Sequence, residues 1–135
     1  MLAWTVAHLG GIDALELADV AEPPAPGPGE ATVAMHAVGL NYPDLLMLSG
    51  GYQYRPQLPF TPGMEGVGRI VAVGEGVSGE LLGHRMLVGG RTGLLAERVT
   101  LPLAALRDVP EALTDAEAAG FTTGALTAFV ALSVR

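Results

Sequence analysis

Short runs of alternating hydrophobic and polar residues dominate the chain up to Thr100. Two such runs, Leu2–Ala7 and Leu15–Val20, flank Gly10-Gly11, and this arrangement predicts a β-hairpin. A proline-rich stretch from Glu22 to Glu30 follows, and it predicts a stiff turn because proline supplies no backbone N–H. Further strands are expected at Ala31–Leu40, Glu65–Val73, Arg85–Val88 and Leu94–Thr100.

The strand at Ala31–Leu40 shows the alternation in detail. A period of two puts Val33, Met35 and Ala37 on one face and Thr32, Ala34, His36 and Val38 on the other. The strand at Glu65–Val73 carries Gly66 and Gly68 in its interior, which indicates a bulge or a tight bend of a barrel.

Helical signals are few until the end of the chain. Pro43 fits the first turn of a short helix that Gly50-Gly51 ends, and a loop from Tyr52 to Pro62 follows. Thr114 and Glu117 have the spacing of a capping box, so a helix should begin there. Gly120 and Phe121 are expected to separate it from a second helix over about Thr123–Val134. Strands followed by helices predict a mainly β domain with a helical tail.

Composition narrows the class of protein. The chain has 135 residues, of which 50% are hydrophobic and 16% charged, with 19 glycines and 10 prolines, so one ordered domain with many turns is expected. A net charge of −7 and only seven basic residues argue against nucleic acid or an anionic membrane surface as a partner. The absence of cysteine from the sequence excludes disulfides and cysteine-based zinc sites.

The uncharged run Ala118–Val134 bears on membrane association. It contains glycine, threonine and serine and is shorter than the ~20 apolar residues of a typical transmembrane helix, so we expect a helix that packs against protein. The N-terminus lacks the basic and apolar regions of a signal peptide, and we expect a cytoplasmic location.

The segment Pro62–Gly74 resembles the signature of the medium-chain dehydrogenase/reductase superfamily. Zinc-dependent alcohol dehydrogenases of that family have Gly-His-Glu where this chain has Gly63-Met64-Glu65. A thioether is a poor ligand for Zn²⁺, so Met64 favours the zinc-free quinone and enoyl reductases. Further segments resemble that branch in the same order: Val38–Asp44, Ser49–Tyr52, Leu58–Gly66, Gly83–Met86, Leu95–Val99 and Leu113–Leu132.

This resemblance implies a GroES-like, partly open β barrel with short helices and a C-terminal helical segment. Residues 1–117 would be the catalytic, substrate-binding domain, and residues 118–135 would begin the connection to a Rossmann domain. That domain binds NADPH in the family, and no G-x-G-x-x-G stands here between a strand and a helix. We therefore expect the substrate half of an NADPH-dependent quinone or enone oxidoreductase that is inactive as this chain alone.

Other interpretations remain open from the sequence. The chain could be a non-enzymatic GroES-like module for binding or homodimerisation, or one subunit of a split enzyme whose Rossmann domain is a separate chain. A fragment of a zinc alcohol dehydrogenase would need a metal site, yet the ligand positions hold Asn41 and Met64. The identity of the quinone or enone is left undetermined.

The resemblance also suggests site residues. Tyr52 matches the tyrosine that enoyl reductases use as proton donor, with an aromatic lid as the alternative. Asn41 would orient substrate or cofactor, or only tie down its own turn. Thr127 matches a threonine that flanks the nicotinamide, with a hydrogen bond to its own helix as the alternative. Glu65 is expected to organise the cleft without reacting.

Overall fold

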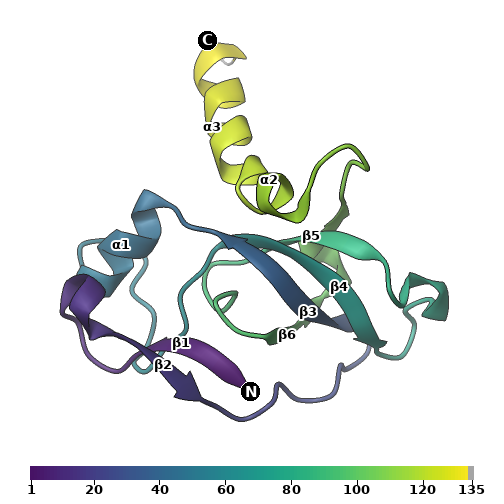
Figure 1. The fold of residues 1–135 in the computed structure, drawn as a ribbon, viewed down its shortest axis with the longest axis horizontal. Coiled ribbons are helices and arrows are strands. Elements are labelled where there is room, and N and C mark those ends of the chain that lie inside the picture. Colours follow the sequence, from purple (N-terminus) through teal and green to yellow (C-terminus); the bar gives the residue numbers. More distant parts are fainter. Residues whose placement is uncertain (134–135) are drawn as a thin grey trace.

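The computed structural model describes residues 1–133, which form two antiparallel β-sheets with helices at their margins (Figure 1). Strands β1 (Leu2–Val6) and β2 (Leu15–Asp19) pair in the predicted hairpin. The larger sheet has the strand order β6-β3-β4-β5-β7. Its strands are β3 (Glu30–Gly39), β4 (Glu65–Val73), β5 (Arg85–Gly89), β6 (Arg98–Pro102) and β7 (Leu106–Asp108).

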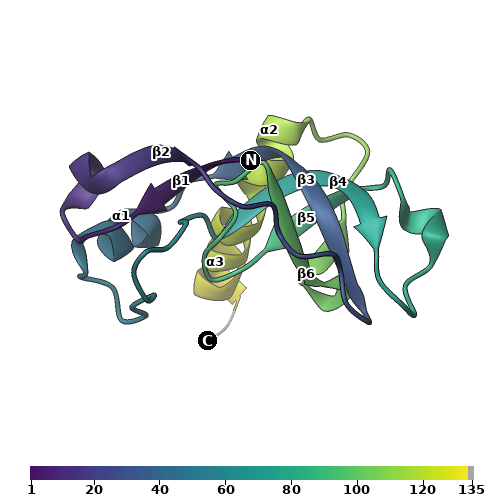
Figure 2. The same cartoon turned by 90° about the horizontal axis from the view of Figure 1, so that it is seen from below.

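Backbone bonds join the hairpin to the loops that flank the larger sheet. Val6 and Phe60 exchange N–H···O bonds of 2.8 and 3.1 Å, and the Trp4 N–H donates to the Leu95 carbonyl at 2.8 Å. Seen from below, in Figure 2, the hairpin lies at one end of the curved sheet, beside α1 (Tyr42–Ser49). The expected architecture, mainly β with short helices and a C-terminal helical segment, is confirmed.

A bulge in β3 changes the predicted distribution of side chains. Met35 lies opposite Gly68 and Ala37 opposite Val67, so His36 is an extra residue in the ladder. Met35 packs against the main core cluster as expected, but Ala37 packs against a second cluster that contains Val67. The prediction that Ala37 shares a face with Val33 and Met35 is therefore wrong, because a single inserted residue reverses the alternation beyond it.

One strand has other bounds than the sequence predicts, and one strand was not predicted. The strand expected at Leu94–Thr100 begins at Arg98, because Leu94 and Leu95 donate backbone bonds to Gly63 and Pro62 in the neighbouring loop. The short strand β7 was not predicted, since three residues are too few to show a period.

The capping box forms as predicted and begins the first of two C-terminal helices. Thr114 caps α2 (Asp115–Ala119), and the backbone and side chain of Thr114 hold the pKa of Glu117 below its ordinary value by hydrogen bonding. Gly120 ends α2, and α3 (Phe121–Ser133) begins at once, so Phe121 lies within the second helix. The predicted end at Val134 lies outside the described residues.

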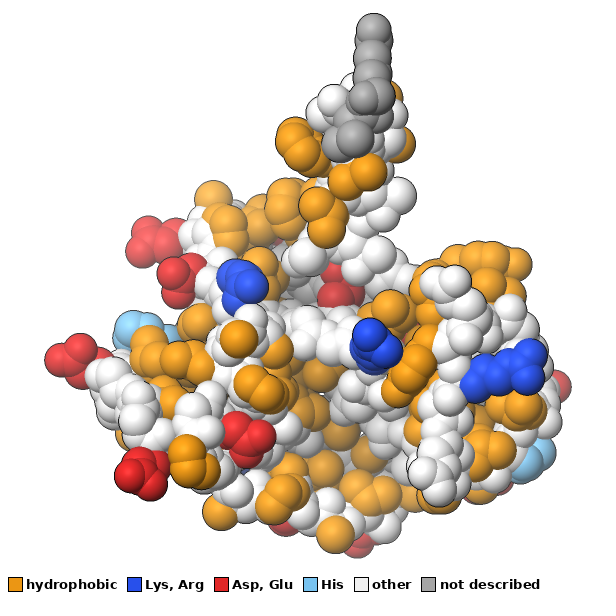
Figure 3. Space-filling view, turned by 180° about the vertical axis from the view of Figure 1, so that it is seen from behind, with side chains coloured by type: hydrophobic (Ala, Val, Ile, Leu, Met, Phe, Trp, Pro, Cys, Tyr) orange, Lys and Arg blue, Asp and Glu red, His pale blue; other side chains and the backbone are white. Residues whose placement is uncertain are grey.

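The two C-terminal helices differ in burial. Ala118 and Ala119 of α2 are buried in the same cluster as Val67, whereas α3 has no buried residue and projects from the body (Figures 1 and 3). The division of the chain at residues 117 and 118 stays a prediction. Among residues 1–133, no helix has both the length and the hydropathy that crossing a bilayer requires.

Candidate functional site

The loop that precedes β4 lies at the centre of the candidate site. Asp44 in the first turn of α1 is buried, and its carboxylate accepts the backbone N–H groups of Asn41 at 2.9 Å and of Gly63 at 3.2 Å. Gly63 has a φ of +101°, which only glycine adopts readily. Asp44 thus ties the corner at Asn41 to the signature segment and sets the direction in which Met64 and Glu65 leave it.

Glu65 connects the sheet, this corner and the projecting helix. Its side chain is 4% exposed, and its two carboxylate oxygens accept the Asn41 Nδ2 at 2.8 Å and the Thr123 backbone N–H at 2.7 Å. Thr123 lies in the first turn of α3, where the free N–H groups and the helix dipole favour an anion. Glu65 therefore holds the base of α3 against the sheet, and the role expected for it in organising the cleft stays a prediction.

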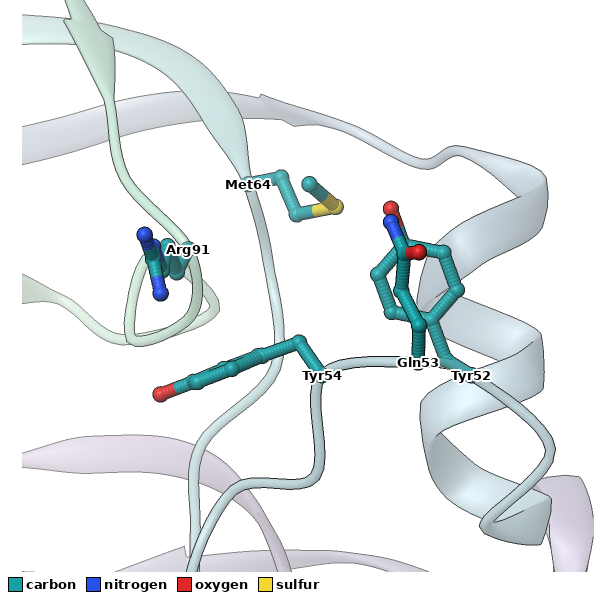
Figure 4. Close-up of a pocket in the computed structure, with 5 residues that line it drawn as sticks. All are labelled: Tyr52, Gln53, Tyr54, Met64 and Arg91. Carbon is teal, nitrogen blue, oxygen red and sulfur yellow. The ribbon is translucent and has the colours of Figure 1, made fainter.

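Beside Glu65, Met64 forms part of a cavity of about 530 Å³ that Tyr52, Gln53, Tyr54 and Arg91 complete. Figure 4 shows Tyr52 and Gln53 on one side of the open space, Tyr54 and Arg91 on the other, and the Met64 side chain between them. This volume lies within the ~300–1,000 Å³ typical of small-molecule sites. We call it the Tyr52 cavity.

A second hollow of about 390 Å³ adjoins the first through Met64. The start of α3 contributes Thr122 and Thr123, and the end of β5 contributes Gly89 and Gly90. Met64 is therefore common to the lining of both hollows.

The predicted site residues are distributed over these features. Tyr52 lines the first cavity, and Asn41 lies at the edge of the site, with one amide hydrogen donated to Glu65. Thr127 is exposed on α3, one turn beyond Thr123 on the same side of the helix, and lines neither hollow. The structure thus brings Asn41, Glu65 and Thr123 into direct contact and leaves the roles of Tyr52, Asn41 and Thr127 as predictions.

Sequence reasoning missed Arg91 and Thr123. Arg91 lies in a loop rich in glycine, between Gly90 and Gly93, and such a loop was a possible signal. Thr123 acts through its backbone N–H, which no side-chain pattern reports.

The candidate site has few side chains that could bind a metal and only a small number of polar groups that could bind NADPH. Within residues 1–133, no three His, Asp or Glu side chains gather as metal ligands would, and Met64 brings a thioether to the signature position. Towards NADPH, Thr122 and Thr123 line the second hollow and Asn41 has an amide at the edge of the site, and such neutral polar groups suit the nicotinamide end better than the charged phosphates.

Residues 27–132 match the family described as "Alcohol dehydrogenase GroES-like domain". The human synaptic vesicle membrane protein VAT-1 homolog is 46% identical over 124 residues, which cover 91% of this chain and 32% of that protein. The quinone oxidoreductase-like protein 2 homolog of Nematostella vectensis is 39% identical over 107 residues, 78% of this chain and 29% of that protein. The chain spans about a third of the length of the curated relatives it matches.

Solved structures agree with these relatives. The human VAT-1 homolog-like protein superposes with a TM-score of 0.91 at 33% identity, over 98% of this chain and 43% of that one. The quinone oxidoreductase of Thermus thermophilus, solved also as its complex with NADPH, superposes with a TM-score of 0.82 at 43% identity. The match covers 98% of this chain and 40% of that one. The chain therefore belongs to the alcohol dehydrogenase GroES-like domain family, in the VAT-1 and quinone oxidoreductase branch of the medium-chain dehydrogenase/reductase superfamily.

Proposed function

We propose that this chain is the substrate-side domain of an NADPH-dependent, zinc-independent oxidoreductase that acts on quinones or other α,β-unsaturated carbonyl compounds. The observation that carries the proposal is the Tyr52 cavity, which lies beside the Glu65 contact with Asn41 and α3. The similarity to quinone oxidoreductases over nearly the whole chain supports it.

Within this proposal NADPH, when bound, supplies the hydride. The Tyr52 hydroxyl donates a hydrogen bond, or its proton, to the substrate oxygen on which negative charge develops. Asn41 can spare one amide hydrogen to orient the substrate or cofactor, because Glu65 uses only the other one. Thr127 flanks the nicotinamide from α3. Met64 fills the position of the zinc ligand with an apolar wall.

A chimera tests the activity. Residues 1–135 would replace the matching domain of the Thermus thermophilus quinone oxidoreductase, and NADPH oxidation would be followed with quinones and enones. We expect turnover, and a fall in kcat of about 10²-fold for Tyr52→Phe, because the phenylalanine lacks the donor. Tyr42→Phe is the matched control, since Tyr42 is 71% exposed and lies outside the Tyr52 cavity. A folded chimera without turnover, or Tyr52→Phe with full kcat, would contradict the proposal.

The chain alone should bind NADPH weakly and show no turnover. Micromolar affinity requires about 8 kcal/mol of binding free energy, and the chain has no glycine-rich phosphate loop with the dinucleotide spacing. Titration calorimetry of residues 1–135 with NADPH measures this directly. A dissociation constant in the low micromolar range would show that the expectation of an inactive half is wrong.

The exposed apolar side of α3 should make the chain self-associate, as a homodimer or larger species. Phe121, Leu126, Phe129, Val130 and Leu132 are 49–81% exposed on α3, and Figure 3 shows hydrophobic side chains along it. Isolated domains seldom expose such a patch without a partner. In sedimentation velocity we expect concentration-dependent association. The double variant Phe129→Gln with Leu132→Gln should weaken it. The control, Leu17→Gln with Leu82→Gln, should not, because these two exposed leucines lie outside α3. A monomer at all concentrations would contradict this expectation.

A further inference from the structure

Arg91 gives the Tyr52 cavity a charged wall. Its guanidinium carbon lies 5.3 Å from the centre of the Tyr54 ring, a distance at which the ring face attracts the cation. In Figure 4 the Arg91 guanidinium and the Tyr54 ring form one side of the space that Tyr52 and Met64 face. A guanidinium group has five N–H donors, so donors remain available to a ligand when the cation lies over an aromatic ring.

The loop that carries Arg91 is anchored on both sides. The Gly90 N–H donates to the Met64 carbonyl at 2.9 Å, and the Gly93 N–H donates to the Thr61 carbonyl at 2.7 Å. Gly93 has a φ of +104°, which a residue with a side chain rarely adopts. The backbone beside Arg91 is therefore held close to Met64, and the exposed Arg91 side chain lines the cavity.

Most other arginines already have polar partners. The sequence contains no lysine, so all seven basic residues are arginines. Four of them form ion pairs with carboxylates or donate hydrogen bonds to backbone carbonyls: Arg98 and Arg85 pair with Glu22 and Asp115, and Arg69 and Arg107 donate to Gly83 and Ala104. Within residues 1–133, Arg91 forms neither an ion pair nor a hydrogen bond, and none of the other four residues that line the cavity is acidic. A protein of net charge −7 thus keeps one donor-rich cation free at the cavity.

From these contacts we infer that the Tyr52 cavity selects substrates that carry an anionic group, such as a carboxylate or sulfonate, on a planar carbonyl compound. The anion pairs with Arg91, and the planar part lies against Tyr52, Tyr54 and Met64. The choice of a carbonyl compound as the substrate rests on the proposed function, whereas the preference for an anionic group rests on Arg91 alone. Guanidinium groups bind carboxylates and similar anions through two parallel hydrogen bonds, which fixes the orientation of the ligand.

Three probes separate the anion from the carbonyl compound. They are 1,4-naphthoquinone-2-sulfonate, the neutral 2-methyl-1,4-naphthoquinone and the redox-inert naphthalene-2-sulfonate, each titrated into ¹⁵N-labelled residues 1–135. Quinones arylate thiols and amines; this chain contains no cysteine or lysine, and its N-terminal ammonium pairs with Asp19, so arylation is confined to one residue that lines no part of the Tyr52 cavity. The amide signals of Tyr52, Met64 and Arg91 identify binding at the cavity.

We expect the sulfonated quinone to bind about tenfold more tightly than the neutral one, which is the gain of one charge-assisted contact. Arg91→Gln should remove this difference, so that the variant binds the sulfonated and the neutral quinone with equal affinity. Arg55→Gln is the control, because Arg55 is exposed next to Tyr54 but does not line the cavity. Added salt should reduce only the preference for the anion.

The remaining outcomes decide between the two proposals. Equal affinities for the two quinones, an equal loss in Arg55→Gln, or no binding of any probe at the cavity would overturn the anion inference. Binding of naphthalene-2-sulfonate as tight as that of the sulfonated quinone, with no binding of the neutral quinone, would keep the role of Arg91 but count against the quinone proposal. Displacement of the sulfonates by NADPH would assign Arg91 to the cofactor and overturn the inference.

Discussion

Replacing Glu65 with alanine should lower the free energy of unfolding by about 4 kcal/mol. The Asn41 amide and the Thr123 N–H both donate to its carboxylate, and Glu65 is 4% exposed, so water cannot easily replace it. A buried donor that loses its partner costs about 1–3 kcal/mol, and here two donors are affected. Urea denaturation measures the change, and hydrogen exchange of the Thr123 amide shows whether the base of α3 has loosened.

Glu65→Gln is the matched control for this prediction. The glutamine Oε1 can accept the Thr123 N–H, and its Nε2 can donate to the Asn41 Oδ1 once that amide has rotated. Both hydrogen bonds are then kept without the negative charge. We therefore expect Glu65→Gln to lower the free energy of unfolding by less than half as much as Glu65→Ala does. Equal losses in the two variants would show that the charge, rather than the hydrogen bonds, holds α3, and a loss below about 1 kcal/mol in Glu65→Ala would contradict the prediction.

Gly68→Ala should destabilise the sheet by about 3 kcal/mol or more. A Cβ at this position would lie 2.2 Å from the Ala34 carbonyl oxygen and 2.6 Å from the Val33 Cγ1, so β3 and β4 would have to separate. Added volume in a packed region typically costs about 1–3 kcal/mol, and the upper end applies because the obstacle includes backbone. Thermal and urea denaturation followed by circular dichroism measure the change.

Gly79→Ala is the control for this substitution. Gly79 lies in a short 3₁₀ turn, has no positive φ, and an added Cβ would meet nothing within 4 Å. We expect a change within about 0.5 kcal/mol. If Gly68→Ala is as stable as Gly79→Ala, then β3 and β4 do not approach each other as closely as the structure shows.

Local signals accounted for most of the elements. The hairpin of β1 and β2, the strand β4, the helix α1 and the capping box of α2 follow from alternation, turn residues and caps that act over a few neighbouring positions. The bulge at His36 could not be predicted, because one extra residue in β3 is defined only by its pairing with β4.

In the candidate site, too, some residues could be predicted from the sequence and others could not. Tyr52, Asn41 and Thr127 came from a resemblance of motifs, and Met64 from a single departure from the signature. Arg91 lies 39 positions beyond Tyr52 in the sequence, and only the anchoring of its loop to Met64 and Thr61 brings it to the cavity.

The sequence by itself determined the family, the mainly β class and the replacement of a zinc ligand by a thioether, because each depends on residue identity or on local periodicity. Only the tertiary structure decided that Glu65 holds both Asn41 and α3, and that Arg91 and Tyr54 face Tyr52 across one cavity. The physical reason is that these contacts join loops and strand ends far apart in the chain. Their meeting depends on strand register, bulges and positive-φ glycines acting together, and no local pattern encodes that combination.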